Sequence, residues 1–203
     1  SHPIAVHPGH SNPHVHMTAS LFDPLTIRGV TLRNRVGVSS MCQYSSVDGH
    51  ATDWHLVHLG SRAVGGAGLV LAEATGVTSE GRISPHDLGI YLDDHVDMLA
   101  RVARFVEAQG AVPGMQLSHA GRKASTDAPW LGGQPLAVAD GGWTPILAPS
   151  ALPFGSRSQT PLSLDLAGIR RIVGAFRDAA RRARDAGFKV LERQGAHGYL
   201  LHE

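Results

Sequence analysis

The chain has 203 residues, of which 42% are hydrophobic and 17% are charged, and its formal net charge is +1. This composition is typical of a globular domain rather than a disordered chain, and the near-zero charge gives no electrostatic basis for binding nucleic acid. No run of about 18 apolar residues occurs, so we expect no membrane span. The single cysteine cannot form an internal disulfide, which favours a reducing, cytoplasmic compartment.

Residues 1–20 differ from the rest of the sequence, because prolines and histidines alternate there with small residues and no helical or strand period is present. We predict a disordered leader or an expression remnant, with Met17 as the native start. A histidine-rich metal-binding tail is the alternative interpretation, although the histidines have no fixed ligand spacing. The folded domain is therefore expected over residues 21–203.

From residue 21 onward, strand and helix patterns alternate along the chain. We predict strands over residues 35–39, 69–74, 112–117 and 188–192. We predict helices over residues 54–64, 93–109 and 163–186, and a Gly-, Pro- and Ser-rich excursion over 120–161. These four β/α steps have the spacing of parallel crossover connections.

Two α/β architectures satisfy this order, an open doubly wound sheet and part of an eight-stranded β/α barrel. A dinucleotide-binding sheet needs a glycine-rich first strand-to-helix turn, where a pyrophosphate rests on backbone amides. Here that turn is Ser39-Ser40-Met41-Cys42, without glycine. The sequence therefore favours a (β/α)8 barrel of which about four units are present, a half-barrel.

The residues at and after the ends of the predicted strands carry most of the candidate chemistry, because ligands of α/β folds meet the carboxyl ends of the strands. They provide a thiol, phenols, carboxamides, a lysine and an imidazole: Cys42, Tyr44, Gln116, Lys123, Gln194, His197 and Tyr199. No carboxylate pair for glycosidic cleavage, nucleophile elbow, phosphate loop or HExxH motif is present. Such a set indicates a cofactor that carries the difficult chemistry.

Several motifs in order resemble the old yellow enzyme family of flavin-dependent ene-reductases, in particular its thermophilic-like subgroup. The motifs are LFDPLTIRGVTLRNRV, SSMCQYSS, EATGV, EGR, QLSHAGRKAS, LAPSALPF and AHGYLLHE. The resemblance runs from about Leu21 to Glu203, and it covers the N-terminal half of the family's barrel. It implies FMN as cofactor, NAD(P)H as reductant and an activated alkene, such as an enone, as substrate.

The resemblance also implies where the flavin would lie. Cys42 would sit beside the flavin ring and tune its redox behaviour, with Met41 packed nearby and Ser39 and Ser40 at the cofactor's edge. The isoalloxazine would be contacted by Ala74 and by Gln116, whose amide can both donate and accept hydrogen bonds.

For the substrate, the resemblance implies that His197, with Gln194, polarises a carbonyl oxygen and that Tyr199 delivers a proton to the alkene. Tyr44 and Lys123 would line the substrate pocket. Fixed donors aimed at the developing enolate oxygen lower the barrier to hydride addition.

The residues alone leave plainer interpretations open. Cys42 is also compatible with an inert buried thiol, and Lys123 with a solvated loop. His119 is expected to be a structural hydrogen-bonding residue, and His55 and His58 are expected to cap their helix or face other elements.

Three positions depart from the family pattern. Gln194 stands where the family has a first histidine, so its hydrogen-bond reach differs. Arg193 occupies a usually apolar strand position and must find a partner or an opening. Ser40 replaces a usual proline, which is expected to loosen the flavin's edge.

The chain has no counterpart of strands seven and eight, whose loops hold the phosphate tail in this family. A parallel half-barrel also leaves two strand edges and an apolar inner face uncovered. We therefore expect a homo- or hetero-oligomeric partner, or a missing half, to complete the barrel. Two alternatives remain: a flavin-free, non-catalytic interaction subunit, and a flavin enzyme with a changed, oxygen-using reaction.

Overall fold

A four-stranded parallel sheet forms the centre of the computed structural model, which describes residues 19–203. The leader predicted over residues 1–20 lies outside the described residues apart from its last two positions. The strands, in their order across the sheet, are β3 (Gly37–Val38), β4 (Leu69–Gly76), β5 (Val112–Ser118) and β8 (Val190–Arg193). Each new strand adds beside the previous one in the same direction, as in the opening half of a β/α barrel.

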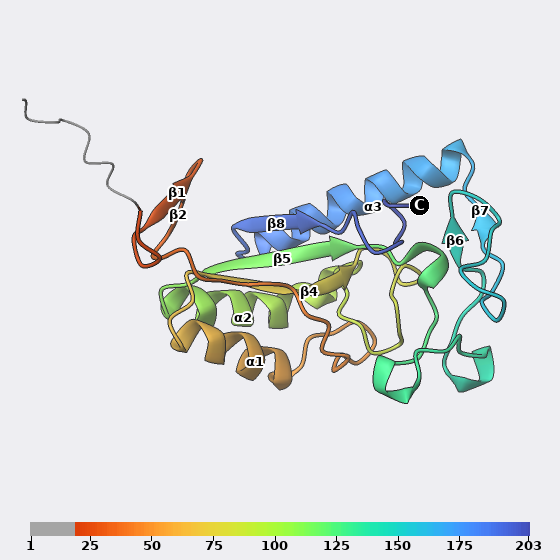
Figure 1. The fold of residues 1–203 in the computed structure, drawn as a ribbon, viewed down its shortest axis with the longest axis horizontal. Coiled ribbons are helices and arrows are strands. Elements are labelled where there is room, and N and C mark those ends of the chain that lie inside the picture. The colour runs from red at the N-terminus through yellow and green to blue at the C-terminus, as the bar shows by residue number, and fades with distance from the viewer. Residues whose placement is uncertain (1–18) are drawn as a thin grey trace, which may run out of the picture.

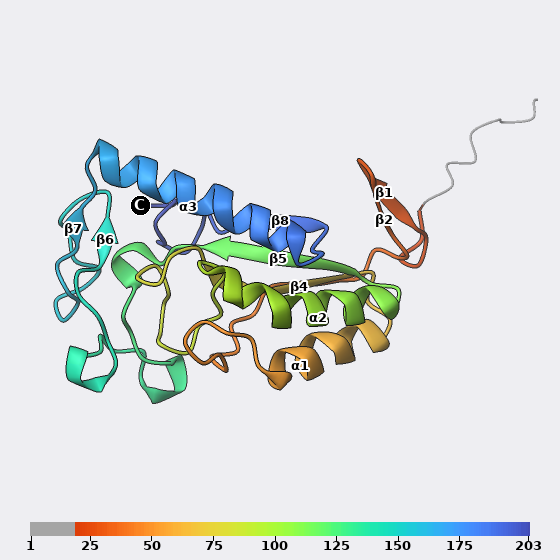
Figure 2. The same cartoon turned by 180° about the vertical axis from the view of Figure 1, so that it is seen from behind.

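The helices connect these strands and pack on one face of the sheet (Figures 1 and 2). They are α1 (Asp53–Val64), α2 (Val96–Ala108), which follows the short 3₁₀ turn η1 (Asp93–His95), and α3 (Leu166–Asp185). Asp165 caps α3, since its side chain accepts the backbone N–H of Gly168 at 2.7 Å. Among the described residues, the opposite face of the sheet carries no helix (Figure 1).

The main hydrophobic core lies between the sheet and the helices. It consists of small and branched apolar side chains, among them Val70, Ala72, Leu99, Val102, Met115, Leu117, Ala179 and Phe188. Gly60 lets α1 approach α2, because a Cβ atom there would lie 2.7 Å from the ring of Phe105. Burial of these side chains removes apolar surface from water and so stabilises the packing of the helices on the sheet.

The four predicted strands and three predicted helices are confirmed, with differences at their ends. Ser163 was expected to start the last helix; it belongs instead to β7 (Leu162–Ser163), which pairs with β6 (Leu147–Ala148), and the helix begins after the Asp165 cap. The first strand is shorter than predicted because only Gly37 and Val38 pair with β4.

An N-terminal hairpin was not predicted. It joins β1 (Leu25–Ile27) to β2 (Val30–Leu32) through a tight turn at Arg28-Gly29, where Arg28 has a φ of 53°. The hairpin lies at the amino end of the parallel strands, away from β6 and β7 at the carboxyl end (Figure 1).

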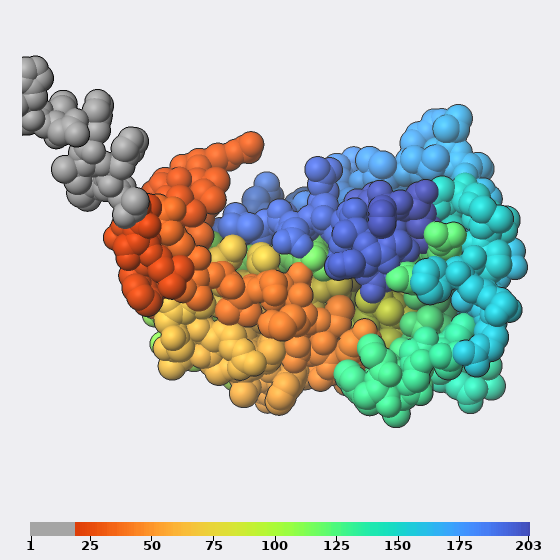
Figure 3. Space-filling model, in the orientation of Figure 1, coloured from red at the N-terminus to blue at the C-terminus, as the bar shows by residue number. Residues whose placement is uncertain are grey.

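The described sheet does not close into a barrel, which confirms the half-barrel expectation. Nearly all of β4 and β5 is buried, whereas Leu191, Glu192 and Arg193 of β8 are exposed. In Figure 3 the orange N-terminal segment and the blue C-terminal segment flank a narrow strip of yellow and green on this face. Within residues 19–203, no helix is both long and apolar enough to cross a membrane.

Candidate functional site

The carboxyl ends of β3, β4, β5 and β8 surround a cleft of about 500 Å³, which we call the strand-end cleft. Parallel strands present the side chains that follow them at one edge of a sheet, so residues far apart in sequence meet there. The lining residues are Ser39, Ser40, Cys42, Ala74, Gln116, Glu192, Gln194, Ala196, His197 and Tyr199.

One wall of the strand-end cleft carries the thiol of Cys42. Burial, followed by the negative charges of Asp87 and Glu73, raises the pKa of Cys42 to about 12. The side chain is therefore a neutral thiol at physiological pH, without the thiolate character of a nucleophilic cysteine. The cleft wall formed by Cys42 and the small side chain of Ala74 is therefore only weakly polar.

The floor of the cleft is the carboxamide of Gln116, which is 6% exposed. Its Nε2 donates to the carboxylate of Glu192, and its Oε1 accepts from Gln194 Nε2 at 3.4 Å. The sequence did not identify Glu192 as a site residue. Side chains two residues apart on a strand share a face, so the predicted site residue Gln194 was the signal that could have found it.

The opposite wall comes from the segment after β8. His197 is exposed and has a φ of 60°, a left-handed conformation that is uncommon outside glycine. Its backbone carbonyl accepts a hydrogen bond from Lys123 Nζ at 2.7 Å, and the same ammonium lies 5.4 Å from the ring centre of Tyr199. Burial raises the pKa of Tyr199 to about 12, so its hydroxyl keeps its proton at neutral pH.

A second cavity of about 330 Å³ adjoins the cleft, because Tyr199 lines both. Tyr44, Lys123 and Phe154 line this loop cavity, and Lys123 Nζ lies 4.4 Å from the ring centre of Phe154. The ring of Tyr44 meets Trp130 edge-on at 5.1 Å. The loop cavity is therefore an aromatic pocket lined by two cationic side chains, Arg122 and Lys123.

Eight of the eleven predicted site residues meet in the strand-end cleft: Ser39, Ser40, Cys42, Ala74, Gln116, Gln194, His197 and Tyr199. Tyr44 and Lys123 lie in the loop cavity instead. Met41 lines neither cavity, and its side chain is 46% exposed. Arg193 was expected to need a partner or an opening, and the structure gives it the opening: it is exposed at the end of β8.

The structural roles expected for His119 and His55 are confirmed. His119 is buried, and its Nδ1 accepts the backbone N–H of Gly121 at 3.1 Å. His55 Nδ1 accepts the backbone N–H of Thr52 at the start of α1, at 2.9 Å. Within the part of the chain that the structure describes, no three His, Cys, Asp or Glu side chains gather as a metal-ligand set.

Comparison with known proteins gives consistent matches. A family model described as "NADH:flavin oxidoreductase / NADH oxidase family" matches residues 20–203. An NADPH dehydrogenase of Geobacillus sp. (strain WCH70) is 46% identical over 189 residues, which cover 92% of this chain and 51% of that protein. The chain therefore spans about half the length of the curated relatives it matches.

Solved structures with a similar fold also match most of this chain and about half of their own length. Old Yellow Enzyme from Pichia sp. AKU4542 matches with a TM-score of 0.78 and 30% identity, over 90% of this chain and 47% of that one. Morphinone reductase in complex with tetrahydroNAD matches with a TM-score of 0.75 and 28% identity, over 90% and 51%.

Proposed function

The chain belongs to the NADH:flavin oxidoreductase / NADH oxidase family, which includes the old yellow enzymes, and from this premise we propose that it forms the flavin and substrate half of an ene-reductase. The observation that carries the proposal is the strand-end cleft, where an amide, a thiol, an imidazole and a phenol from separate strands line one space.

FMN, with NAD(P)H as reductant, is the cofactor of this family, and the cleft residues fit its ring. Small side chains at Ser39, Ser40, Ala74 and Ala196 leave space for a flat aromatic ligand. The amide of Gln116 has the donor and the acceptor that the pyrimidine edge of a flavin needs. When bound and reduced, FMN supplies the hydride for an activated alkene.

On the flavin side, Cys42 presents a neutral thiol to the ring, and Gln116 orients its polar edge. Ser39 and Ser40 lie at the rim of the cleft, where their hydroxyls can hydrogen-bond the cofactor. Met41 lies outside the lining of the cleft, and its carbonyl accepts a hydrogen bond from the side-chain Nε2 of Gln43 at 2.7 Å.

On the substrate side, His197 donates to the carbonyl oxygen of an enone, and Gln194 supplies a weaker second donor. These donors stabilise the enolate charge that forms as the alkene is reduced. Tyr199 transfers its proton to the α-carbon, which its raised pKa permits because the hydroxyl remains protonated at neutral pH. Tyr44 and Lys123 bound the space for the rest of the substrate.

A second polypeptide segment completes the barrel in this proposal. The exposed residues of β8 and the short edge strand β3 are the two positions where further strands would pair. The segment is either the remainder of a longer chain, a second copy or a different subunit, and it would hold the phosphate tail of FMN.

The test is the visible spectrum of the full-length protein, purified with any partner and titrated with FMN. We expect flavin absorption bands that NADPH bleaches and that 2-cyclohexenone restores under nitrogen. A protein that stays colourless after FMN addition contradicts the proposal. Reoxidation by oxygen alone, with no effect of the enone, would instead favour the oxygen-using reaction.

One observation favours a second candidate, a flavin-free subunit that stabilises its partner. Both ends of the Gln116 amide already have partners inside the cleft, in Glu192 and Gln194. If these bonds persist, only the second N–H and the second lone pair of the amide remain for a flavin, which weakens its contact with the ring. Glu192→Ala would then confer FMN binding on a protein that otherwise lacks it, whereas the ene-reductase proposal expects binding in both forms.

A further inference from the structure

Glu73 is a buried carboxylate that the proposed mechanism does not use. It is 3% exposed and does not line the strand-end cleft. It is also the extra residue of a β-bulge, because Ala72 pairs with Met115 and Ala74 pairs with Gln116 on the facing strand. Bulges are rare between parallel strands and frequent beside active sites, where they redirect a side chain.

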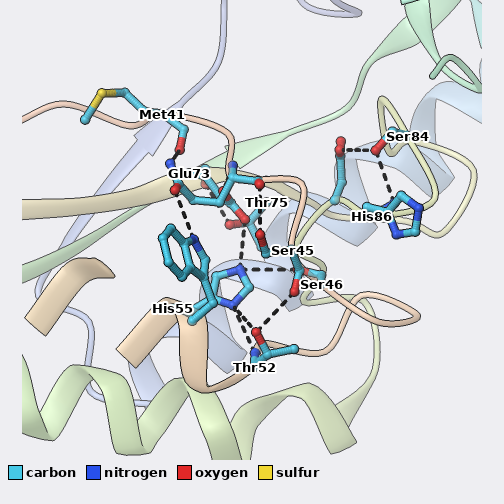
Figure 4. Close-up of polar contacts among 12 residues, drawn as sticks. Met41, Ser45, Ser46, Thr52, His55, Glu73, Thr75, Ser84 and His86 are labelled. Carbon is cyan, nitrogen blue, oxygen red and sulfur yellow. Dashed lines mark hydrogen bonds and ion pairs between the residues drawn. The ribbon is translucent and has the colours of Figure 1, made fainter. Parts of the chain in front are cut away.

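Hydrogen bonds hold the backbone of the bulge, and both carboxylate oxygens of Glu73 have partners. The hydroxyl of Thr75 donates to the carbonyl of Glu73 at 2.8 Å. One carboxylate oxygen accepts the backbone N–H of Gln43, and the other lies 3.0 Å from His55 Nε2 (Figure 4). Both oxygens of this buried carboxylate therefore have a hydrogen-bond partner, as buried polar groups require.

The hydrogen bonds of His55 fix its tautomer. Its Nδ1 accepts the backbone N–H of Thr52, so Nδ1 carries no proton. The proton of the neutral ring is therefore on Nε2, which donates to Glu73. The imidazole thus connects the start of α1 to the bulge of β4 in a defined direction.

The same cluster holds the segment after Cys42 at successive positions (Figure 4). Besides the Gln43 amide, the Ser45 carbonyl accepts from the Thr52 hydroxyl at 3.1 Å, and the Ser46 hydroxyl lies 3.3 Å from His55 Nε2. Tyr44, between these points, has a φ of 51°. A left-handed conformation at a residue other than glycine is unfavourable and persists only where surrounding contacts impose it.

We propose that Glu73 is a positioning residue: through the Gln43 amide and His55 it fixes the segment 42–46, so that Cys42 and Tyr44 face their cavities. The importance of that orientation rests on the proposed function, in which Cys42 meets the flavin and Tyr44 meets the substrate. The contacts that impose it are independent of any ligand.

The proposal has a consequence for the thiol. The ionisable groups that face Cys42 are Glu73 on β4, Asp87 in the following loop, Tyr44 on its own segment and Tyr199 after β8. At neutral pH only the two carboxyl groups can be negative, and both disfavour the thiolate. Removing the charge of Glu73 should therefore lower the pKa of Cys42.

Two readouts test the proposal on the full-length protein, the pH profile of Cys42 alkylation by iodoacetamide and the hydrogen exchange of the Gln43 amide. In Glu73→Gln we expect the alkylation rate at about pH 9 to rise about threefold or more, which corresponds to half a pKa unit. The Gln43 amide should exchange about tenfold faster. Glu80→Gln, which removes the carboxylate paired with Arg171 farther along the chain, should change neither.

A matched pair at His55 separates positioning from general loss of structure. His55→Asn keeps an acceptor near the Nδ1 position for the Thr52 amide but loses the donor to Glu73. His55→Gln keeps a donor near Nε2 and loses the acceptor. We expect His55→Asn to reproduce the faster exchange of the Gln43 backbone N–H, because Glu73 loses a partner that holds it, and His55→Gln to leave this exchange as in the native protein. The thiol profile should stay close to native in both variants, because neither removes the Glu73 carboxylate.

The proposal is overturned if folded Glu73→Gln leaves both readouts unchanged. If Glu73→Gln does not fold, equal exchange rates of the Gln43 backbone N–H in the two His55 variants overturn it. Repeating the measurements with and without FMN separates the two proposals. A protein that binds no FMN but shows the expected changes refutes the proposed function alone, and one that binds FMN without those changes refutes the positioning role alone.

Discussion

The two walls of the strand-end cleft are built in different ways. The Cys42 wall is supported from behind by buried groups, since Glu73, His55 and Asp87 are all under 4% exposed. The His197 wall follows the exposed strand β8, and Lys123 provides its hydrogen bond to the His197 carbonyl. Under the proposed function, this difference predicts that these residues preorganise the flavin side themselves, whereas the substrate side depends on the segment that would cover β8.

The largest expected effect concerns the proton donor on the exposed wall. In Tyr199→Phe, the rate of alkene reduction should fall by about 10²–10³, because the proton must come from solvent. Reduction of the bound flavin by NADPH should change little, since that step needs no donor at this position. Stopped-flow measurement of the two half-reactions would separate them.

Tyr91→Phe is the matched control, because the hydroxyl of Tyr91 donates to the Asp48 carbonyl outside both cavities. It should leave both half-reactions unchanged. Equal losses in the two half-reactions of Tyr199→Phe would mean that Tyr199 supports the cleft rather than donating the proton.

A smaller effect is expected from removing the hydrogen bond between Lys123 and the His197 carbonyl, which holds the exposed wall. Lys123→Met keeps the apolar stem and removes the hydrogen bond to the His197 carbonyl. A charged hydrogen bond contributes about 1.5 kcal/mol, so kcat/KM for an enone should fall about tenfold. Flavin affinity, measured by fluorescence titration, should stay within twofold, about the limit of that measurement. A loss of flavin affinity as large as the loss of activity would show that the walls are not independent.

The smallest effect concerns the stability of the supported wall. Asp87 accepts the backbone N–H of Ile83 at 2.6 Å and the Ser84 hydroxyl at 2.8 Å, and burial raises its pKa from 3.8 to about 7. A raised pKa contributes stability that is fully present below pH 3.8 and is lost as the pH rises through about 7. The native protein should therefore lose stability over this range.

Asp87→Asn cannot ionise, so its Tm relative to the native protein should rise by several degrees between about pH 5 and pH 8. Thermal denaturation followed by circular dichroism at both pH values checks this. A constant Tm difference would mean that Asp87 is already ionised at low pH and that another group supports the wall.

The order of the β/α units was predictable because each strand is a short apolar run and each helix ends at a glycine such as Gly65 or Gly187. Eight cleft residues were found because they lie near or after the carboxyl ends of these strands. Glu73 lies within the strand predicted over residues 69–74, but its role was not predictable, since a bulge is set by the pairing of two strands. The hairpin at Arg28-Gly29 was missed because strands of three residues carry too little periodicity.

The most direct test of the difference between the walls is hydrogen exchange of the full-length protein with and without FMN. We expect residues 42–46 to be protected in both states, and residues 193–199 to gain protection when FMN is added. If residues 42–46 are protected only when FMN is present, the flavin side is not preformed. If residues 193–199 are equally protected without FMN, the substrate side does not depend on the ligand. Either result would contradict the account.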